Sequence, residues 1–406
     1  MKFTSKRCVV ACCLGAAALC ASLGVRAQGL SGYAGDPESG SRLRTSLEVG
    51  TDYTTNFFYA RKAAEDSGSG LIVRPELSLT RKLSRFTFSA AANAEAGWYD
   101  LPGNADDYFD SALKLGSRWQ SAPRHQFDFE ARLRNGHNPF GTERTENTPL
   151  EDRKIDTWRE TQTELRYLAG LPSDRLNFEL GLGGLNKEYT NNEAVTRFLS
   201  HEKTSAYLTT YLNMTTKSSV FLVVAGQRTY FEDVAPGAFD RGATTLRYLL
   251  GARWAATAKT SGDFRVGYVD RNPTDPNRDS FQRFDWLAEL TWAPRAVRKL
   301  LLQTGRTAQE SFLNTVDFID NRYGTLTWSE QWTPLMQTQA TVRYMTSSFI
   351  GSSRQDESWG YGLSAEYQLT PYLALLGLAS HGQRDSEVNF ANYERFYAYL
   401  GARYAR

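Results

Sequence analysis

The sequence predicts an all-β chain folded as one transmembrane, antiparallel, up-and-down β-barrel of about 18 strands. Three observations predict this fold. Segments of about ten residues alternate apolar and polar side chains along the whole chain, the breaks between them are alternately short and long, and the chain opens with an export signal. A closed sheet with lipid on one face and water on the other requires such a pattern.

The export signal comes first in the chain. A positive start at Lys2, Lys6 and Arg7 leads into small and apolar residues from 9 to 24. Val25-Arg26-Ala27 then matches a small-residue cleavage pattern, so we expect residues 1–27 to be removed. The apolar stretch is shorter than the ~20 residues of a spanning helix, which favours cleavage over anchoring.

Cysteine usage and charge exclude several classes of protein. All four cysteines lie inside the signal at positions 8, 12, 13 and 20, so the mature chain can form neither a disulfide nor a thiolate metal site. A lipoprotein anchor at Cys20 is the alternative, but the bulky Leu19 precedes it. Removing Lys2, Lys6, Arg7 and Arg26 changes the formal charge from +2 to −2, so no basic excess indicates a nucleic-acid partner.

Alternation of side chains defines each strand. In the segment from 86 to 98 one face is phenylalanine, alanine and tryptophan, whereas the other carries polar residues such as Asn93 and Glu95. The same pattern recurs from 127 to 134, from 358 to 369 and from 396 to 404. Eighteen such segments are centred near residues 48, 76, 92, 114, 130, 162, 181, 209, 223, 250, 266, 287, 301, 326, 340, 363, 376 and 398. Those near 76, 223, 301 and 326 alternate poorly, which leaves 16 to 18 strands.

The connections predict the topology. Even-numbered strands lead into tight turns at 121–124, 171–174, 215–218, 293–295, 333–334 and 370–371, and odd-numbered strands lead into long polar stretches such as 135–154, 187–203 and 305–320. Short periplasmic turns and long extracellular loops are typical of outer-membrane barrels. Aromatic residues before several turns (Trp119, Tyr167, Trp292, Trp332 and Tyr367) suit a girdle at the lipid boundary. We therefore expect a signal peptide at 1–27, a short periplasmic leader at 28–42 and a barrel at 43–406.

A soluble all-β fold is the alternative. A propeller would show a blade motif every ~40 residues, and a sandwich would not explain alternating turn lengths together with an export signal. The barrel in the outer membrane of a Gram-negative bacterium is the favoured interpretation.

The side chains that face the barrel interior are polar and of both signs. One interpretation is a hydrated, ion-paired wall; the other is a conduit that orders a polar solute by charge-assisted hydrogen bonds. Inward tyrosines could also stack on sugar rings. The candidate lumen-lining residues are Arg132, Arg134, Asp128, Glu130, Arg166, Glu164, Arg253, Arg265, Arg283, Glu289, Tyr207 and Tyr211.

Enzymatic function is not expected. We interpret the four histidines as turn, loop or strand-end residues (His125, His137, His201 and His381). The chain contains neither a Gly-x-Ser-x-Gly nor a His-Glu-x-x-His motif. We expect no cofactor and no metal. The short leader also leaves no room for the N-terminal plug of an energy-coupled receptor.

The opening strand, Leu47-Glu48-Val49-Gly50-Thr51-Asp52-Tyr53-Thr54-Thr55-Asn56-Phe57-Phe58, resembles the β-barrel porins encoded with bacterial exopolysaccharide genes. Thr55 stands where an aspartate is common in that family. The Tyr-Leu-Gly-Ala-Arg-Tyr run from Tyr399 to Tyr404 also fits. The resemblance implies export of an extracellular polysaccharide, with periplasmic and inner-membrane polysaccharide synthesis and export proteins as partners.

The leading hypothesis is therefore a barrel channel for export of an extracellular polysaccharide. A general or sugar-selective porin for small polar solutes is the alternative, and a barrel enzyme or surface adhesin is the third. Expected partners are the outer-membrane lipid bilayer and the barrel-insertion machinery, and no nucleic acid.

Overall fold

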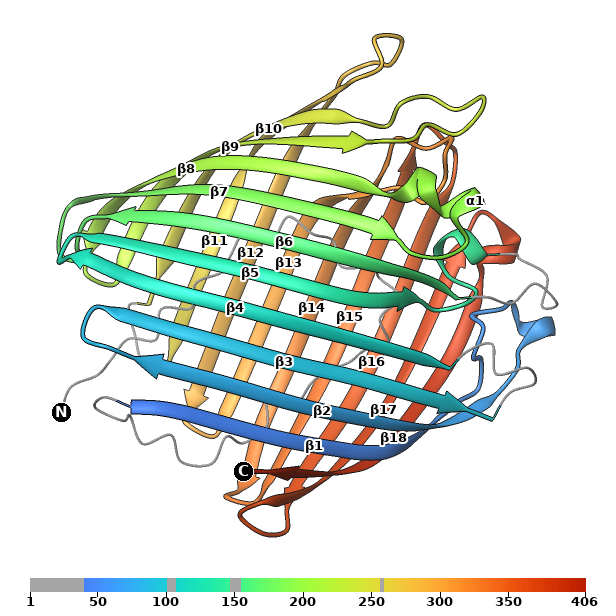
Figure 1. Cartoon of the computed structure of the whole chain (residues 1–406), viewed down its shortest axis with the longest axis horizontal. Coiled ribbons are helices and arrows are strands. Elements are labelled where there is room, and N and C mark those ends of the chain that lie inside the picture. Colours follow the sequence, from blue (N-terminus) through green and yellow to red (C-terminus); the bar gives the residue numbers. More distant parts are fainter. Residues whose placement is uncertain (1–39, 101–106, 147–154, 256–258) are drawn as a thin grey trace.

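A computed structural model describes residues 40–100, 107–146, 155–255 and 259–406. In this part of the chain, 18 antiparallel strands form one sheet that closes on itself (Figure 1). The expected signal peptide and most of the expected leader lie outside the described residues. The first strand begins at Gly40, in place of the predicted residue 43.

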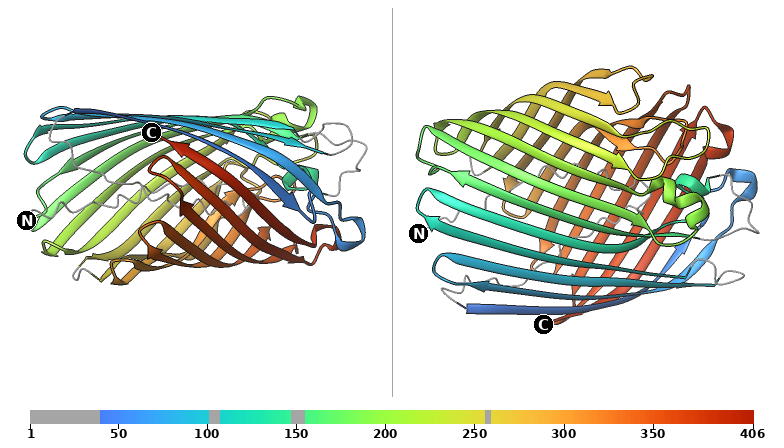
Figure 2. Two further views of the ribbon diagram at one scale, coloured as in Figure 1. Left: turned by 90° about the horizontal axis from the view of Figure 1, so that it is seen from below. Right: turned by 45° about the horizontal axis from the view of Figure 1, so that its top comes forward.

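The strands are 12 to 16 residues long and run obliquely, so that those of the near and far walls cross in projection (Figure 2). They are β1 (Gly40–Thr54), β2 (Gly68–Lys82), β3 (Phe86–Tyr99), β4 (Tyr108–Ala122), β5 (His125–Asn138), β6 (Asp156–Ala169), β7 (Leu176–Tyr189), β8 (His201–Thr215), β9 (Ser218–Phe231), β10 (Ala243–Trp254), β11 (Thr260–Pro273), β12 (Phe281–Arg295), β13 (Arg298–Glu310), β14 (Phe318–Thr333), β15 (Met336–Ile350), β16 (Gln355–Gln368), β17 (Leu373–Ser386) and β18 (Tyr393–Ala405).

Each strand pairs with its neighbours in sequence, and β1 closes the barrel by pairing with β18 from Ser46–Ala405 to Thr54–Tyr397. Closure is necessary because lipid offers no hydrogen-bond partner to a free strand edge. Every predicted strand centre falls within one of these strands. The predicted barrel and its 18 strands are therefore confirmed.

The two ends of the barrel differ (Figure 1). At the end that we call the turn end, short connections such as residues 123–124 and 216–217 join even strands to odd ones. Arg406 also lies there, and its backbone exchanges hydrogen bonds of 2.8 and 2.9 Å with Thr45. The other, the loop end, carries the longer connections and the short helices: η1 (Lys62–Ala64), η2 (Glu143–Thr145), α1 (Glu193–Thr196), η4 (Arg197–Leu199) and η5 (Asn389–Ala391).

No helix in the described ranges is both long and apolar enough to cross a membrane.

Several loops are shorter than the sequence predicts. β5 continues to Asn138, β7 to Tyr189 and β13 to Glu310, so the predicted loop boundaries at 135, 187 and 305 are wrong. The polar residues there continue the ladder, because backbone pairing remains favourable where a strand leaves the lipid. Strand ends therefore cannot be read from the loss of apolar residues.

The predicted turn at 293–295 is also wrong, because these residues end β12. The β12–β13 register shifts between Trp292 and Arg295. Pro294 lies inside that irregularity, where its missing N–H breaks no regular pair.

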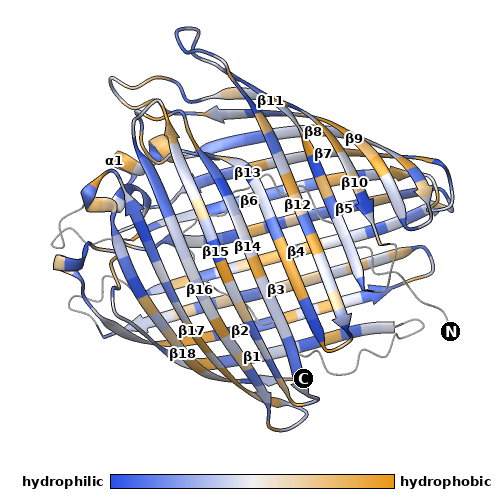
Figure 3. Ribbon diagram, turned by 180° about the vertical axis from the view of Figure 1, so that it is seen from behind, coloured by the Kyte–Doolittle hydropathy of each residue, from blue (hydrophilic) through white to orange (hydrophobic). Residues whose placement is uncertain are grey.

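The outward faces of the strands are apolar. Large hydrophobic side chains that are at least partly exposed occur on every strand, and Figure 3 shows hydrophobic and hydrophilic residues alternating along them. Trp119, Trp292, Trp332 and Tyr367, which the sequence places in a girdle, are about half exposed near the turn end. So large an apolar surface requires lipid around it.

Candidate functional site: the barrel lumen

Strand alternation turns every residue of the predicted lining set inward. On β5, for example, Phe129 and Leu133 are exposed on the outer face, so Asp128, Glu130 and Arg132 lie on the opposite face. The same parity holds on β6, β8, β10, β11 and β12, where exposed Leu, Phe and Tyr side chains alternate with the predicted residues. The inward faces therefore form a polar lumen.

The structure brings predicted residues together in ionic groups on β5–β6 and on β10–β11, and Arg283 pairs with Asp285 on β12. On β5 and β6, Arg132 lies 3.2 Å from Glu130, and Arg134 Nε donates to Glu160 at 3.1 Å. On β10 and β11, Arg253 and Arg265 each lie 2.8 Å from the carboxylate of Asp263. The charges of the lining thus largely satisfy one another.

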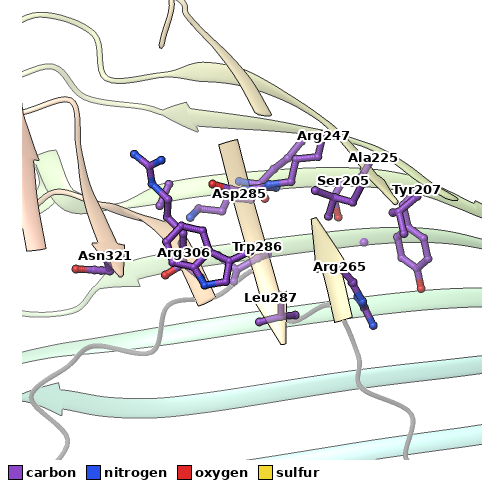
Figure 4. Close-up of a pocket in the computed structure, with 18 of the residues that line it drawn as sticks. Ser205, Tyr207, Ala225, Arg247, Arg265, Asp285, Trp286, Leu287, Arg306 and Asn321 are labelled. Carbon is purple, nitrogen blue, oxygen red and sulfur yellow. The ribbon is translucent and has the colours of Figure 1, made fainter. Parts of the chain in front are cut away.

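A cavity of about 460 Å³ occupies the lumen between β6 and β15. Of the predicted residues, Glu164, Tyr207, Arg265 and Glu289 line it, together with polar groups such as Gln227. Figure 4 shows Tyr207 and Arg265 among the residues around it. We call this space the lumen cavity.

Tyrosines and carboxylates meet at one side of the lumen cavity. Tyr207 donates to Glu179 at 2.9 Å and lies 3.3 Å from Glu164, and Tyr211 donates to the second oxygen of Glu179 at 3.0 Å. The Nε of Arg343, which also lines the cavity, is buried and has no hydrogen-bond partner among the described residues.

The lumen on the side of β1 to β4 and β18 is filled in a different way. Tyr99 donates to Asp52 at 3.0 Å and Tyr108 to Glu95 at 2.6 Å, while Tyr399 donates to Glu48 at 2.8 Å. Arg74 joins Glu48 and Glu95 at 2.8 and 2.6 Å. This network packs around Ile72 and Tyr397 and leaves the open space to the other half of the barrel.

Glu310 joins three strands across the lumen near the loop end. Lys203 of β8 and Arg271 of β11 each lie 3.1 Å from its carboxylate oxygens. The sequence interpretation missed Glu310 and Lys203 because it assigned both to loops. Continued period-two alternation was the available signal for Lys203 on β8. On β13 the same alternation would have placed Glu310 on the outward face with Leu302, so its lumen position had no signal in the sequence.

The loop end is bridged by charged side chains from distant loops. Glu146, in the β5–β6 loop, accepts hydrogen bonds from Arg354 at 2.8 and 3.3 Å. It also forms an ion pair with Arg384 of β17 at 2.8 Å. The side chains of Glu146 and Arg354 are 5% and 4% exposed. Burial disfavours the charge of Arg354, but its bonds to Asp356 and Glu146 outweigh this and raise its pKa. We call this contact the loop bridge.

A second set of loops meets at Arg241, which donates to the carbonyl oxygens of Phe198 and Ser311. These residues belong to the β9–β10, β7–β8 and β13–β14 connections. The described loops therefore fold over the lumen and pack on one another.

Each histidine lies near one polar group among the described residues. His125 bonds to the Tyr167 hydroxyl at 2.6 Å, His137 to Asp110 at 2.9 Å and His201 to the Leu199 carbonyl at 2.9 Å. His381 lies within β17, not in a loop or at a strand end as the sequence suggested, 3.6 Å from Glu394.

Solved structures resemble the barrel at low sequence identity. The outer membrane protein opdK of Pseudomonas aeruginosa matches with a TM-score of 0.49 and 9% identity over 90% of this chain and 99% of that one. OccAB3 of Acinetobacter baumannii matches with a TM-score of 0.44 and 12% identity, over 90% of this chain and 99% of that one. The FrpB iron transporter of Neisseria meningitidis (F5-1 variant) matches with a TM-score of 0.49 and 8% identity, over 86% of this chain and only 64% of that one.

No curated protein matches the sequence. A family match covers the whole barrel, from residue 40 to residue 406. It begins where β1 begins and ends with the last residue of the chain. With its closed sheet, apolar outer face and polar lumen, the chain belongs to the family described as Putative beta-barrel porin 2, the β-barrel channels of the outer membrane.

Proposed function

We propose that the barrel is the channel through which an extracellular polysaccharide crosses the outer membrane of a Gram-negative bacterium. The observation that carries this proposal is a lumen that is polar but nearly balanced in charge. Arg253 and Arg265 share Asp263, and Lys203 and Arg271 share Glu310. Paired charges create little field of one sign, so such a lumen favours neutral, hydrogen-bonding solutes over simple ions.

Sugars suit the groups that remain available. A sugar presents hydroxyl groups that both donate and accept, together with flat C–H faces that pack on aromatic rings. Tyr207 and Tyr211 offer rings beside the Glu179 carboxylate, and Arg343 offers a buried donor. The predicted lining residues would then form the wall along which the polymer moves.

The resemblance of the opening strand to porins encoded with exopolysaccharide genes supports the same substrate. Under this proposal the signal peptide is cleaved after Ala27, the barrel is inserted by the outer-membrane machinery, and polysaccharide synthesis and export proteins of the inner membrane and periplasm deliver the polymer.

Deletion of the gene tests the proposal. Surface polysaccharide should disappear while uptake of small sugars is unchanged, and the wild-type chain should restore the polymer. A chain with Tyr207→Ala should restore it less well, whereas Tyr248→Ala, on the outward face of β10, serves as the matched control. Loss of small-solute uptake with intact polymer would refute polysaccharide export.

A general or sugar-selective porin is the second candidate. The lumen cavity of about 460 Å³ has the size of a small-molecule site. Proteoliposomes that hold the barrel should then swell in monosaccharides and disaccharides at rates that fall with solute size. Absence of swelling would remove this candidate.

A further inference from the structure

The barrel wall is incomplete between β12 and β13. Their ladder runs from Arg295–Arg298 at the turn end only as far as Leu287–Gly305. On their other sides both strands continue to be paired, β12 with β11 as far as Phe281 and β13 with β14 as far as Glu310. Residues 281–286 of β12 and 306–310 of β13 are therefore not paired with each other, and we call this break the β12–β13 gap. Here the inner face of β11 and β12 packs on the even-numbered face of β13 and β14, because Arg271 pairs with Glu310 and Phe281 meets Phe318 edge to face.

The lumen cavity reaches this gap. Its lining includes Asp285 and Thr307, which face inward, and also Trp286 and Arg306, which share the outward face of their strands with the exposed Leu290 and Leu302. Figure 4 shows Asp285, Trp286 and Arg306 close together at the cavity. In a fully paired wall, residues of the outward face would not border the lumen.

Side chains hold the two edges in place of a backbone ladder. Arg306 donates to the Phe284 carbonyl at 3.0 Å and forms bonds of 2.6 to 3.1 Å with Asp320. Arg283 pairs with Asp320 as well, and with Asp285 at 2.6 Å. The gap is consequently lined by ionic groups.

An aromatic row sets the depth of the gap. Tyr248, Tyr268 and Phe284 are exposed on the outer face and lie directly opposite one another across β10, β11 and β12. Such a row marks the level of the lipid headgroups. Backbone edges cannot face hydrocarbon, so the occupant of the gap at this level must be polar.

We propose that the β12–β13 gap binds the phosphate headgroup of a membrane lipid. Three arginines (Arg283, Arg306 and Arg322) meet only two carboxylates (Asp285 and Asp320), which leaves one positive charge in excess. Arg322 lies directly opposite Arg306 on β14, half exposed and 3.9 Å from Asp320. Guanidinium groups match phosphate geometry, and the acyl chains would lie against Trp286 and Phe284 on the outer face. The inference does not depend on what the lumen transports.

Fluorescence quenching tests lipid entry. The chain contains no cysteine after residue 20, so single-cysteine variants label cleanly. A bimane on Thr307→Cys, beside the gap, should be quenched by brominated phosphatidylglycerol in the vesicle. A bimane on Gln303→Cys, which also lines the cavity but lies where β12 and β13 are paired, should be quenched several-fold less. Equal quenching at the two positions would overturn the proposal.

The headgroup requirement is tested with the same label. Brominated galactosyl diacylglycerol, which lacks phosphate, should quench the Thr307→Cys bimane less than brominated phosphatidylglycerol does. Adding Arg322→Gln should reduce quenching by phosphatidylglycerol. If both lipids quench equally, the gap does not recognise phosphate and the proposal fails.

Disulfide formation tests the gap itself. Phe284→Cys with Ala308→Cys would face each other if the ladder continued, and Leu290→Cys with Leu302→Cys is the paired control on the same face. Oxidation should bridge the control and leave the gap pair reduced, because a disulfide needs Cα atoms within about 7 Å. Bridging of both pairs at the same rate would mean that the wall is closed.

Discussion

Asn56 gives the opening-strand motif a structural role. It is fully buried where β1 enters the β1–β2 loop. Its side chain donates to the carbonyl oxygens of Ala60 at 2.6 Å and Glu394 at 3.0 Å and accepts from the Ala60 amide at 2.9 Å. One amide side chain therefore fixes the first loop to the start of β18 and holds the loop end of the closing seam.

Replacing Asn56 with alanine should destabilise the barrel. Each buried backbone group left without a partner costs about 1–3 kcal/mol. We expect the folded band of Asn56→Ala on semi-native gels to convert to the unfolded band at a lower temperature. Asn186→Ala, at an exposed position on β7, should convert at the wild-type temperature. Equal temperatures for both variants would mean that the motif asparagine does not stabilise the seam.

Two lumen arginines of β5 balance the charge of neighbouring carboxylates. Arg132 and Arg134 neutralise Glu130 and Glu160. Changing both arginines to glutamate should place four carboxylates together and shift the channel toward cations, because lumen substitutions tune selectivity. The reversal potential in planar bilayers under a salt gradient measures the shift. An unchanged potential would place these arginines off the conduction path.

At the scale of elements, the β1–β2 and β5–β6 loops pack on each other. Phe58 and Phe140 meet edge to face with ring centroids 5.6 Å apart, and both side chains are buried. Gly141 follows with φ +80°, and a Cβ there would lie 1.6 Å from the Phe58 carbonyl oxygen. This contact requires glycine for both its conformation and its space.

Gly141→Ala should therefore separate the two loops. Protease added to intact cells should cleave the extracellular loops of this variant faster than those of the wild type. Gly237→Ala is a matched control, since Gly237 also has a positive φ of 76° but nothing lies within 4 Å of its Cβ position. Faster cleavage of both variants would indicate backbone strain alone as the cause.

Glu143 makes the same loop sensitive to pH. Burial raises the pKa of its carboxyl above the ordinary 4.5, and Asn138 donates to it at 2.6 Å. The pKa of Glu143 is higher in the packed loop than in the unfolded chain. The carboxyl of Glu143 therefore stabilises the loop fully below pH 4.5, and this stabilisation is lost as pH rises through the raised pKa. Intrinsic-rate-corrected hydrogen exchange of residues 139–146 should accelerate as pH rises above 4.5 through the raised pKa of Glu143. In Glu143→Gln this acceleration should vanish; its persistence would assign the effect to another group.

At the scale of the whole molecule, the barrel combines a packed half, an open half and a bridged outer end. The tyrosine network fills the side of β1 to β4, the lumen cavity lies between β6 and β15, and the loop bridge joins loops from opposite walls. We expect the open half and the bridge together to limit what can pass.

Breaking the loop bridge should widen the channel. Arg354→Ala removes the cation that Glu146 and Asp356 share, while Arg384 still pairs with Glu146. Loss of the buried partner costs about 3–5 kcal/mol. We expect a higher single-channel conductance, whereas Arg159→Ala, exposed on β6, should conduct as the wild type does. A conductance equal to that of the wild type would show that the bridge does not limit flow.

Strand number, strand facing and the end of the barrel that carries the turns were all available from the sequence. Local alternation determined the strands and their facing, because a strand between lipid and water must alternate residue by residue. The alternating lengths of the connections determined which end carries the turns. The inward position of residues such as Arg132 and Tyr207 followed from the same rule.

Tertiary structure alone decided which charges meet. Glu146 and Arg354 are 208 residues apart, and Glu310 joins β8 to β11. These contacts, like the halt of the β12–β13 ladder at Leu287, depend on the cross-section of the barrel and the paths of its loops. A period of two indicates which face of the strand a side chain lies on. It carries no information about which residue that side chain contacts across the lumen.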